Sequence, residues 1–308
     1  MKKYLIVGSS ILLGIAAVIV MSQVYSRPTS VRPTPKTTSP SSTVARVVVS
    51  SSTVQRPAYT PPPLNADAYL VGNAETGQVY ISHNSQTVSP IASISKLFTA
   101  LEIYANMDPN QVIEITQPML DVYPNSYGFA LGEKFSLHEL MYPLLVQSNN
   151  NIAEGIAMTY GYDTFISKLN ALATSLGMPV THFQDASGLS NGNISNAHDL
   201  FIFAQYLYAS HRDLLALTTT FSWTFASTTD HGAHLILSTD PFIGDPHLVG
   251  GKTGRTDIAG ETMLTIFNYE FKGKNYPIAI IVLHSDPGQR QTDSERLLFQ
   301  AMAVIQKQ

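Results

Sequence analysis

Three short polar clusters stand out in the chain, because each holds side chains that can move a proton or attack a carbonyl carbon. In chain order they are Ser93-Ile94-Ser95-Lys96, Ser148-Asn149-Asn150 and Lys252-Thr253-Gly254. Each cluster is a weak signal by itself, because short patterns of this kind recur by chance. Lys96, however, is the only one of the ten lysines with a serine three residues before it. The three clusters also lie at the expected ends of secondary-structure elements, so together they predict one shared site.

The first cluster suggests a serine nucleophile that is activated by a lysine. A serine hydroxyl is a poor nucleophile until a neighbouring base accepts its proton. On a helix, residues three apart share a face, so the Lys96 amine can approach the Ser93 hydroxyl. A lysine acts as a base only when it is neutral, which requires burial and a second cation nearby to lower its pKa. We expect Lys252 to be that cation.

The other features of the clusters fit the same chemistry. A helix N-terminus presents free N–H groups and a positive dipole end to whatever docks there. Gly254 has no side chain, so a substrate backbone could lie against the strand edge as an added strand. Purely structural interpretations also exist: helix capping for the two serine clusters and a plain strand turn for the lysine cluster. The joint occurrence of the three clusters favours a catalytic site.

The elements that must position these clusters follow from the hydrophobic pattern. A helix is expected to start near Ser93. Residues 136–160 are predicted to form two helices separated by a break near residues 147–151, and a helical pattern continues to about Leu217. A closing helix is predicted from about Thr292 to Ile305. The predicted strands cover residues 66–73, 77–83, 248–254, 260–271 and 276–285. Strands at both ends with helices between them predict an α+β fold, in which one antiparallel sheet unites N- and C-terminal segments around a helical subdomain.

Two side-chain groups carry further expectations. The apolar stripe of the helix that starts near Ser93 is expected to consist of Leu97, Phe98, Leu101, Ile103 and Tyr104. His231 and His234 lie in the segment DHGAH, whose carboxylate and cysteine company does not suggest a metal site, so we expect a surface loop there.

The charge distribution limits the possible partners. Residues 1–63 hold seven of the 18 basic side chains and none of the 22 acidic ones, which leaves 11 basic against 22 acidic in the rest. An acidic globular part makes nucleic acid an unfavourable partner, because phosphate binding needs clustered Lys and Arg. The chain has no cysteine, which excludes disulfides, thiolate metal sites and a cysteine nucleophile.

The N-terminal region is typical of a membrane anchor followed by a spacer. Lys2 and Lys3 precede an uncharged, mostly apolar run over residues 4–21, about long enough to cross a bilayer. Residues 1–25 are therefore predicted to be a single-pass anchor, or alternatively a cleaved signal peptide, and either would place the rest outside the cytoplasm. Residues 26–63 contain eight prolines and read as a disordered linker. The folded domain is expected to cover residues 64–308.

The three motifs, in this order, resemble those of the penicillin-binding protein and serine β-lactamase superfamily. Four blocks are similar specifically to low-molecular-weight penicillin-binding proteins of the D-alanyl-D-alanine carboxypeptidase family: SPIASISKLFTAL, LLVQSNNNIAEGIA, FQDASGLSNGNISNAHDLFIFAQYL and GGKTGRTDIAGETML. The resemblance spans about Leu64 to the C-terminus. It implies a β-lactamase/DD-peptidase-like fold, a peptidoglycan stem peptide ending in D-Ala-D-Ala as substrate, covalent inhibition by β-lactam antibiotics, and no cofactor or metal.

The resemblance also implies a role for each residue of the proton path. Ser93 would be acylated as it attacks the peptide bond between two D-alanines, with Lys96 as the general base. Ser148 would pass a proton to the departing D-alanine amine. Lys252 would tune this path electrostatically, and water would then release the acyl group.

A second set of residues would hold the substrate. Asn150 would bind its backbone amide, and the backbone N–H groups of Ser93 and Arg255 would form the oxyanion hole. Thr253 would bind the terminal carboxylate beside Gly254. Arg290 is assigned the same role on a looser local match.

Several other functions share these motifs. A class A β-lactamase needs a glutamate some 35 residues after its Ser-x-Asn motif, and the chain has no glutamate between Glu154 and Glu261, which disfavours that alternative. A D,D-endopeptidase that cuts peptidoglycan cross-links uses identical chemistry and stays open. A non-catalytic wall-binding protein on the same scaffold is a third alternative, although all the catalytic residue types are in place.

Overall fold

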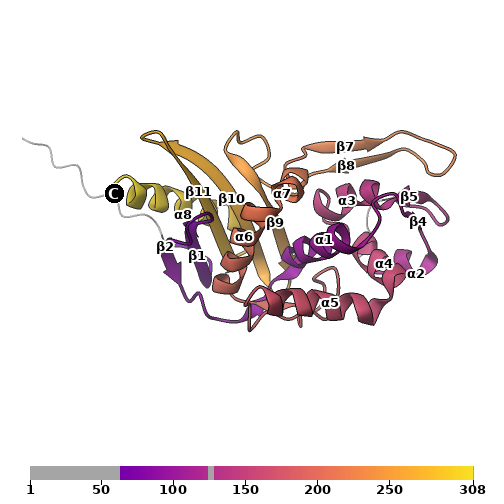
Figure 1. Cartoon of the computed structure of the whole chain (residues 1–308), viewed down its shortest axis with the longest axis horizontal. Coiled ribbons are helices and arrows are strands. Elements are labelled where there is room, and N and C mark those ends of the chain that lie inside the picture. The colour runs from indigo at the N-terminus through magenta and orange to yellow at the C-terminus, as the bar shows by residue number, and fades with distance from the viewer. Residues whose placement is uncertain (1–62, 124–127, 308) are drawn as a thin grey trace, which may run out of the picture. The chain divides into compact units, whose positions relative to one another are not determined.

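A five-stranded antiparallel sheet forms the centre of the domain in the computed structural model, which describes residues 63–123 and 128–307 (Figure 1). The strand order is β2-β1-β11-β10-β9. The strands are β1 (Ala68–Asn73), β2 (Val79–His83), β9 (Leu248–Thr256), β10 (Gly260–Phe271) and β11 (Lys274–Ser285). The N-terminal strand β1 pairs directly with the C-terminal strand β11, with Val71 opposite Ile280. The predicted union of the two ends of the chain in one sheet is confirmed.

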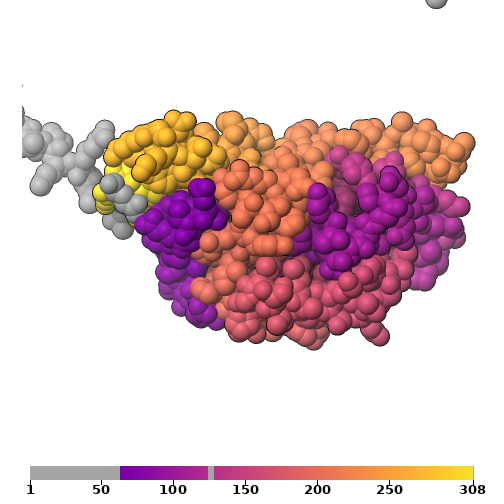
Figure 2. Space-filling view, in the orientation of Figure 1, coloured from indigo at the N-terminus to yellow at the C-terminus, as the bar shows by residue number. Residues whose placement is uncertain are grey.

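Helices cover both faces of this sheet. On one face, α1 (Ser95–Asn106) and α6 (Ala197–Ser210) share a buried apolar cluster with Leu70, Leu264 and Ile281. On the other face, α8 (Arg290–Ile305) buries Leu297 against residues of the opposite side of the same strands. Figure 2 shows the indigo N-terminal strands beside this yellow C-terminal helix. The central strands are therefore apolar on both faces.

The helical subdomain and several short strand pairs lie between β2 and β9 in the chain. Its helices are α2 (Gln117–Leu120), α3 (Leu137–Leu145), α4 (Asn150–Tyr160), α5 (Tyr162–Ser175) and α7 (Arg212–Thr218). The two-stranded pairs are β3 (Ser89–Pro90) with β6 (Ile194–Ser195), β4 (Val112–Glu114) with β5 (Lys134–Ser136), and β7 (Ser222–Phe225) with β8 (His234–Leu237). The predicted break between α3 and α4 is confirmed. These two- to four-residue strands are too short to give a sequence signal.

Aromatic packing fixes α1, the helix that carries Lys96. Phe98 is fully buried and stacks on Phe203 of α6 with ring centroids 3.6 Å apart. Its ring is also tilted against that of Phe183, with ring centroids 4.7 Å apart. Burying aromatic rings of this size is among the largest single contributions to a core. The helix is thus held rigidly at the start of the candidate site.

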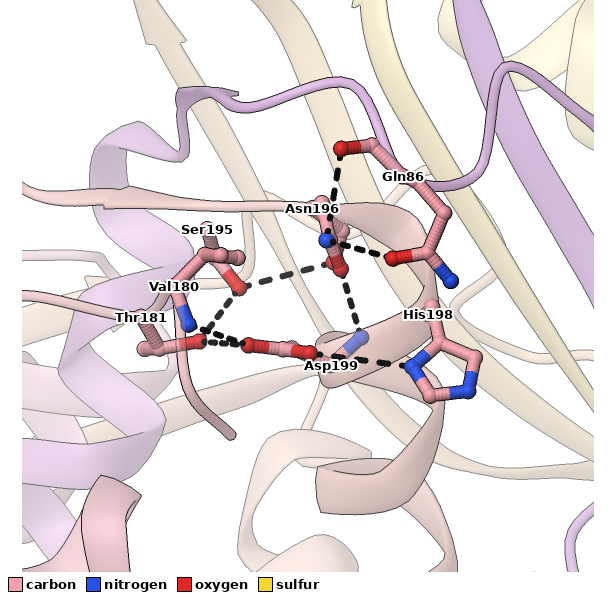
Figure 3. A network of polar contacts seen from close by, with 7 residues as sticks. All are labelled: Gln86, Val180, Thr181, Ser195, Asn196, His198 and Asp199. Carbon is pink, nitrogen blue, oxygen red and sulfur yellow. Dashed lines mark hydrogen bonds and ion pairs between the residues drawn. The ribbon is translucent and has the colours of Figure 1, made fainter. Parts of the chain in front are cut away.

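A polar network holds the start of α6 and the strand that leads to Ser93 (Figure 3). The Asn196 side chain caps α6 by accepting a hydrogen bond from the Asp199 N–H at 2.7 Å. The Asp199 carboxylate accepts bonds from Thr181 Oγ1 and the Val180 N–H, and Asn196 Nδ2 reaches the side chain of Gln86 at 3.3 Å. Because Gln86 lies just before β3, this network ties α6 to the segment that enters the nucleophile turn.

Some details differ from the sequence-based expectations. Tyr104 is 56% exposed on α1, so it is not part of the apolar stripe. The closing helix begins two residues earlier than predicted, at Arg290. No helix in the described ranges is long and apolar enough to span a bilayer. The predicted anchor (residues 1–25) and all but the last residue of the predicted linker (26–63) lie outside those ranges.

Candidate active site

The candidate nucleophile Ser93 sits on a tight turn immediately before α1. It belongs to a short 3₁₀ helix, η1 (Ala92–Ile94), and the α-helix proper begins at Ser95. Ala92 has a φ of +48°, a left-handed conformation that is rare for a residue with a side chain. Such strained residues persist only where the surrounding structure enforces them, and they cluster at functional sites. The turn places Ser93 at the start of α1, one turn before Lys96.

Gly188 packs directly against the backbone of this turn. It has a φ of +84°, and a β-carbon built on it would lie 1.9 Å from the Ala92 carbonyl oxygen and 3.0 Å from the Ser93 nitrogen. Only glycine therefore fits against the backbone of the nucleophile turn.

Replacing Gly188 with alanine should displace the nucleophile turn. We expect Gly188→Ala to lower the free energy of unfolding by at least about 1–2 kcal/mol, the cost of a left-handed alanine alone, and to slow acylation of Ser93 as well. Urea denaturation and a fluorescent-penicillin labelling rate measure the two effects. Gly177→Ala is the matched control, because Gly177 has a φ of +74° with no atom within 4 Å of the built β-carbon. Equal labelling rates in both variants would contradict the contact argument.

Lys96 is fully buried, and its amine lies at the centre of the candidate site. Its Nζ atom donates hydrogen bonds to Ser93 Oγ at 3.0 Å, Asn150 Oδ1 at 2.7 Å and the backbone carbonyl oxygen of Ser187 at 2.6 Å. These contacts join residues from η1, α1, α4 and the loop after α5. The structure thus brings the predicted nucleophile and the predicted amide group each within direct hydrogen-bond reach of the predicted base.

Burial lowers the pKa of Lys96 to about 7, while the nearby carboxylates of Asp185 and Glu154 raise it. Near neutral pH a substantial fraction of this amine is therefore the free base that general-base catalysis requires. The expected lowering of the pKa is confirmed, but its main cause is removal from water rather than the charge of Lys252.

The Ser148-Asn149-Asn150 motif forms the junction between α3 and α4. Ser148 has a φ of +63°, a second left-handed residue with a side chain. Asn149 caps α4 by accepting a bond from the Ile152 N–H at 3.1 Å, and its own N–H donates to the Pro143 carbonyl. The capping interpretation is thus correct for Asn149. It leaves Asn150 free to face Lys96, and Ser148 is half-buried at the bend.

The third motif lies on β9, the edge strand of the sheet. A β-carbon built on Gly254 would lie 2.9 Å from the Ser93 nitrogen, so this strand passes directly beside the nucleophile turn. Lys252 is 2% exposed and donates a hydrogen bond from Nζ to the Thr253 carbonyl at 3.0 Å. The pKa of Lys252 is lowered well below its ordinary value, mainly by burial and to a lesser extent by the charge of Lys96. The two buried amines therefore lie close enough that protonation of one disfavours protonation of the other.

The predicted carboxylate-binding residues gather at the same edge. Thr253 Oγ1 lies 3.2 Å from the Thr239 hydroxyl. The guanidinium of Arg290, from the first turn of α8, donates to the Gly254 carbonyl at 2.9 Å, and its Nε lies 3.9 Å from Glu261. Arg255 follows Gly254 on β9 and is exposed. The structure thus places Arg290 beside the third motif, whereas its contact with substrate stays a prediction, as does that of Arg255.

Sequence reasoning missed several groups around Lys96. The Ser187 carbonyl belongs to a loop that Asp185 shapes by accepting bonds from the N–H groups of Ser187 and Gly188. The residue type gives no indication of what a backbone carbonyl contacts. Glu154, one turn after Asn150 on α4, is buried and accepts a bond from the Tyr162 hydroxyl at 2.8 Å. Burial raises the pKa of this carboxyl.

The expectation of a surface loop at His231 and His234 is wrong. His231 is buried and stacks on Phe135 with ring centroids 4.4 Å apart. His234 Nε2 lies 2.8 Å from a carboxylate oxygen of Glu133, far away in sequence. His231, in the loop between β7 and β8, and His234, the first residue of β8, form part of an aromatic cluster with Phe129 and Phe135. Within residues 63–123 and 128–307, no group of three His, Cys, Asp or Glu is arranged to hold a metal ion.

The chain is similar in sequence to known D-alanyl-D-alanine peptidases. The family model for D-alanyl-D-alanine carboxypeptidases (peptidase S11) matches residues 54–286. The carboxypeptidase DacB2 of Mycobacterium tuberculosis is 30% identical over 204 residues, covering 65% of this chain and 69% of the relative. A D-alanyl-D-alanine endopeptidase of Escherichia coli is 32% identical over 243 residues, covering 72% of each chain.

Solved structures show the same architecture. A D-alanyl-D-alanine carboxypeptidase of M. tuberculosis superposes with a TM-score of 0.70 at 27% identity, covering 81% of this chain and 95% of that structure. Penicillin-binding protein D2 of Listeria monocytogenes, solved with bound cefotaxime, gives a TM-score of 0.67 at 28% identity, covering 79% of this chain and all of that one. The expected DD-peptidase-like α+β fold is confirmed.

Proposed function

Because the chain belongs to the D-alanyl-D-alanine carboxypeptidase family, we propose that it removes the terminal D-alanine from peptidoglycan stem peptides through an acyl-enzyme on Ser93. The observation that carries this proposal is the buried Lys96 amine, 3.0 Å from the Ser93 hydroxyl and beside a wall formed by β9. A serine with a desolvated base at this distance is equipped for acyl transfer.

The reaction follows from the positions of these groups. Lys96 accepts the proton of Ser93 as the hydroxyl attacks the carbonyl carbon between the two D-alanines. The negative charge on the carbonyl oxygen is held by the N–H groups of Ser93 and Arg255. Ser148 passes a proton to the leaving amine. Water then attacks the ester carbon, Ser93 regains its proton, and the shortened peptide leaves.

Substrate position depends on the two sides of the cleft. Asn150 holds the backbone amide of the stem peptide, while the peptide lies along the edge of β9 as an added strand. Thr253 and Arg290 bind the terminal carboxylate at the Gly254 end of that strand. A penicillin places its own carboxylate and strained amide in the same positions and acylates Ser93.

A second candidate is D,D-endopeptidase activity on peptidoglycan cross-links, favoured by the 32% identity to the E. coli endopeptidase. The bond cleaved is chemically the same, and only the side chain of the departing residue differs. Incubating the protein separately with a pentapeptide ending in D-Ala-D-Ala and with a purified cross-linked dimer separates the two functions. Release of free D-alanine from the pentapeptide supports carboxypeptidase activity. Cleavage of the dimer without cleavage of the pentapeptide would show that the protein is an endopeptidase instead.

We also propose that the N-terminal residues place this domain outside the cytoplasm. Support comes from the apolar run over residues 4–21 behind two lysines, and from the substrate, because peptidoglycan lies beyond the membrane. Residues 26–63 would then act as a spacer between the membrane and the catalytic domain. Fractionation of cells and the N-terminal sequence of the mature protein test the anchor against a cleaved signal peptide.

The rate of acylation should depend on the protonation of Lys96. Because its pKa is about 7 and only the neutral amine accepts a proton, the rate should rise as pH increases through 7. Below that value it should fall about tenfold per pH unit. Stopped-flow labelling with a fluorescent penicillin between pH 5.5 and 9 measures the profile. A rate that is flat across this range would exclude Lys96 as the titrating base.

A further inference from the structure

The backbone carbonyl of Ser187 makes the shortest hydrogen bond of the Lys96 amine, at 2.6 Å, and lies outside the three motifs. The other two contacts of the amine are Asn150 Oδ1 at 2.7 Å and Ser93 Oγ at 3.0 Å. A backbone carbonyl oxygen and a side-chain amide oxygen can only accept hydrogen bonds, whereas a hydroxyl can also donate one. The amine therefore faces two oxygens that only accept and one hydroxyl that can give it a proton.

This set of neighbours determines how the free base is oriented. A protonated lysine amine has three N–H donors, so the neutral amine has two N–H donors and one lone pair. When Asn150 and Ser187 accept the two N–H bonds, the lone pair is left for the Ser93 hydroxyl. If the Ser187 carbonyl moved away, one N–H would be free to donate to Ser93, and the lone pair would point elsewhere. A base in that orientation does not accept the proton of Ser93.

Thr99 holds the loop that carries this carbonyl. It lies on α1 three residues after Lys96, so the two side chains share one face of the helix. Thr99 is fully buried, and its hydroxyl donates a hydrogen bond to the Ala186 carbonyl at 2.6 Å. Helix α1 therefore binds two successive carbonyls of the loop, that of Ala186 through Thr99 and that of Ser187 through Lys96.

The far end of the same loop is fixed separately. Asn193 is fully buried, and its Nδ2 atom donates to Ser95 Oγ at 3.0 Å and to the Asp185 carboxylate at 2.9 Å. The Ser95 hydroxyl in turn donates to the Ala92 carbonyl at 2.8 Å. Asn193 thus ties the loop to the start of α1, whereas Thr99 ties it to the next turn of the helix. The Thr99 bond is the one made to the peptide unit directly before Ser187.

We propose that Thr99 is a positioning residue for the general base. Its hydroxyl holds the loop so that the Ser187 carbonyl keeps one N–H of Lys96, which leaves the lone pair of the amine for Ser93. The inference rests on the proposed function, because it concerns the base of the same reaction. Thr99 acts through the backbone of the loop and not on the reacting atoms themselves.

The test compares acylation of the full-length wild type, Thr99→Val and Thr99→Ser by a fluorescent penicillin. Valine has nearly the shape of threonine without the hydroxyl, whereas serine keeps the hydroxyl. Stopped-flow labelling at several penicillin concentrations gives the dissociation constant of the first complex and the maximal acylation rate separately. We expect Thr99→Val to lower the maximal rate by about 10- to 100-fold with an unchanged dissociation constant, because small misplacements of a catalytic group have effects of this size. Thr99→Ser should keep most of the wild-type rate.

Two controls separate this role from a loss of stability. The fraction of protein labelled at long times reports how much of it is folded, whereas the rate constant reports the site in the folded molecules. Thr265→Val is the matched substitution at a second fully buried threonine, on β10, whose hydroxyl has no hydrogen-bond partner among the described residues. It should be acylated at the wild-type rate. If Thr99→Val unfolds in a thermal melt, Thr99→Ala takes its place and should be slower than Thr99→Ser by the same factor, because these two differ only in the hydroxyl.

Different failures identify different errors. A wild type that penicillin does not acylate would remove the proposed function itself. An acylated wild type with an equal maximal rate in Thr99→Val would overturn the role of Thr99. A smaller labelled fraction with an unchanged rate constant would also overturn it and assign Thr99 to stability alone. A change in the dissociation constant alone, or a Thr99→Ser variant as slow as Thr99→Val, would count against it equally.

Discussion

Replacing Ser93 with alanine should abolish covalent labelling by penicillin and release of D-alanine, while leaving the fold intact. The hydroxyl is the only atom that forms the bond to the acyl group in the proposed reaction, so no partial activity through the acyl-enzyme can remain. Ser93 is half-buried in the middle of η1, and its hydroxyl oxygen accepts one side-chain hydrogen bond, from Lys96. Loss of that bond should change the free energy of unfolding by only about 1 kcal/mol.

Intact-mass spectrometry after incubation with benzylpenicillin measures this directly. The wild type should gain the mass of one penicilloyl group, and Ser93→Ala should gain none. Ser175→Ala, which removes an exposed helical hydroxyl that bonds the Leu172 carbonyl, serves as the control and should label like the wild type. Equal labelling of Ser93→Ala and the wild type would assign the nucleophile to another residue.

The second large effect is expected for Lys96→Ala. Removing the base should slow acylation by about 100- to 10,000-fold, the usual contribution of a positioned general base. The fold should survive, because burial of the lysine amine is itself unfavourable and its loss offsets part of the lost hydrogen bonding. Stopped-flow labelling gives the rate, and circular dichroism gives the melting temperature.

Two further measurements make the Lys96 result specific. Lys168 lies on α5, where its Nζ is 3.4 Å from a carboxylate oxygen of Glu102. The Lys168→Ala variant should be acylated at the wild-type rate. The residual acylation of Lys96→Ala should also lose its dependence on pH near 7, since the titrating amine is gone. An unchanged rate in Lys96→Ala would require a different base, and the buried Glu154 would be the first to test.

The parts of the fold and site that sequence predicted are those with a local signal. The i, i+3 spacing of Ser93 and Lys96 determines their approach on one helical turn, whatever the tertiary structure. Continuous apolar runs revealed the central strands, and the polar break between two apolar helices revealed Ser148 and Asn150. The convergence of the three motifs was expected from their joint occurrence, and the structure supplies the contacts that bring them together.

The remaining features depend on contacts between distant residues. The Ser187 carbonyl reaches Lys96 because hydrogen bonds to the Asp185 carboxylate determine the shape of the loop. The type of a residue does not indicate what its backbone oxygen contacts. The left-handed conformation of Ala92 could not be predicted from the sequence either, because alanine has no preference for that conformation. It occurs where Gly188 packs against the backbone of the turn.

The pairing of β1 with β11 has a consequence for how the protein becomes active. The sheet stays incomplete until β11 has been synthesised, long after β1, and pairings between such distant segments form slowly. Lys252 and Gly254 reach Ser93 only through that sheet, so a nascent or truncated chain should be inert toward antibiotic. Reactivity with penicillin would therefore report the moment at which β11 has joined the sheet.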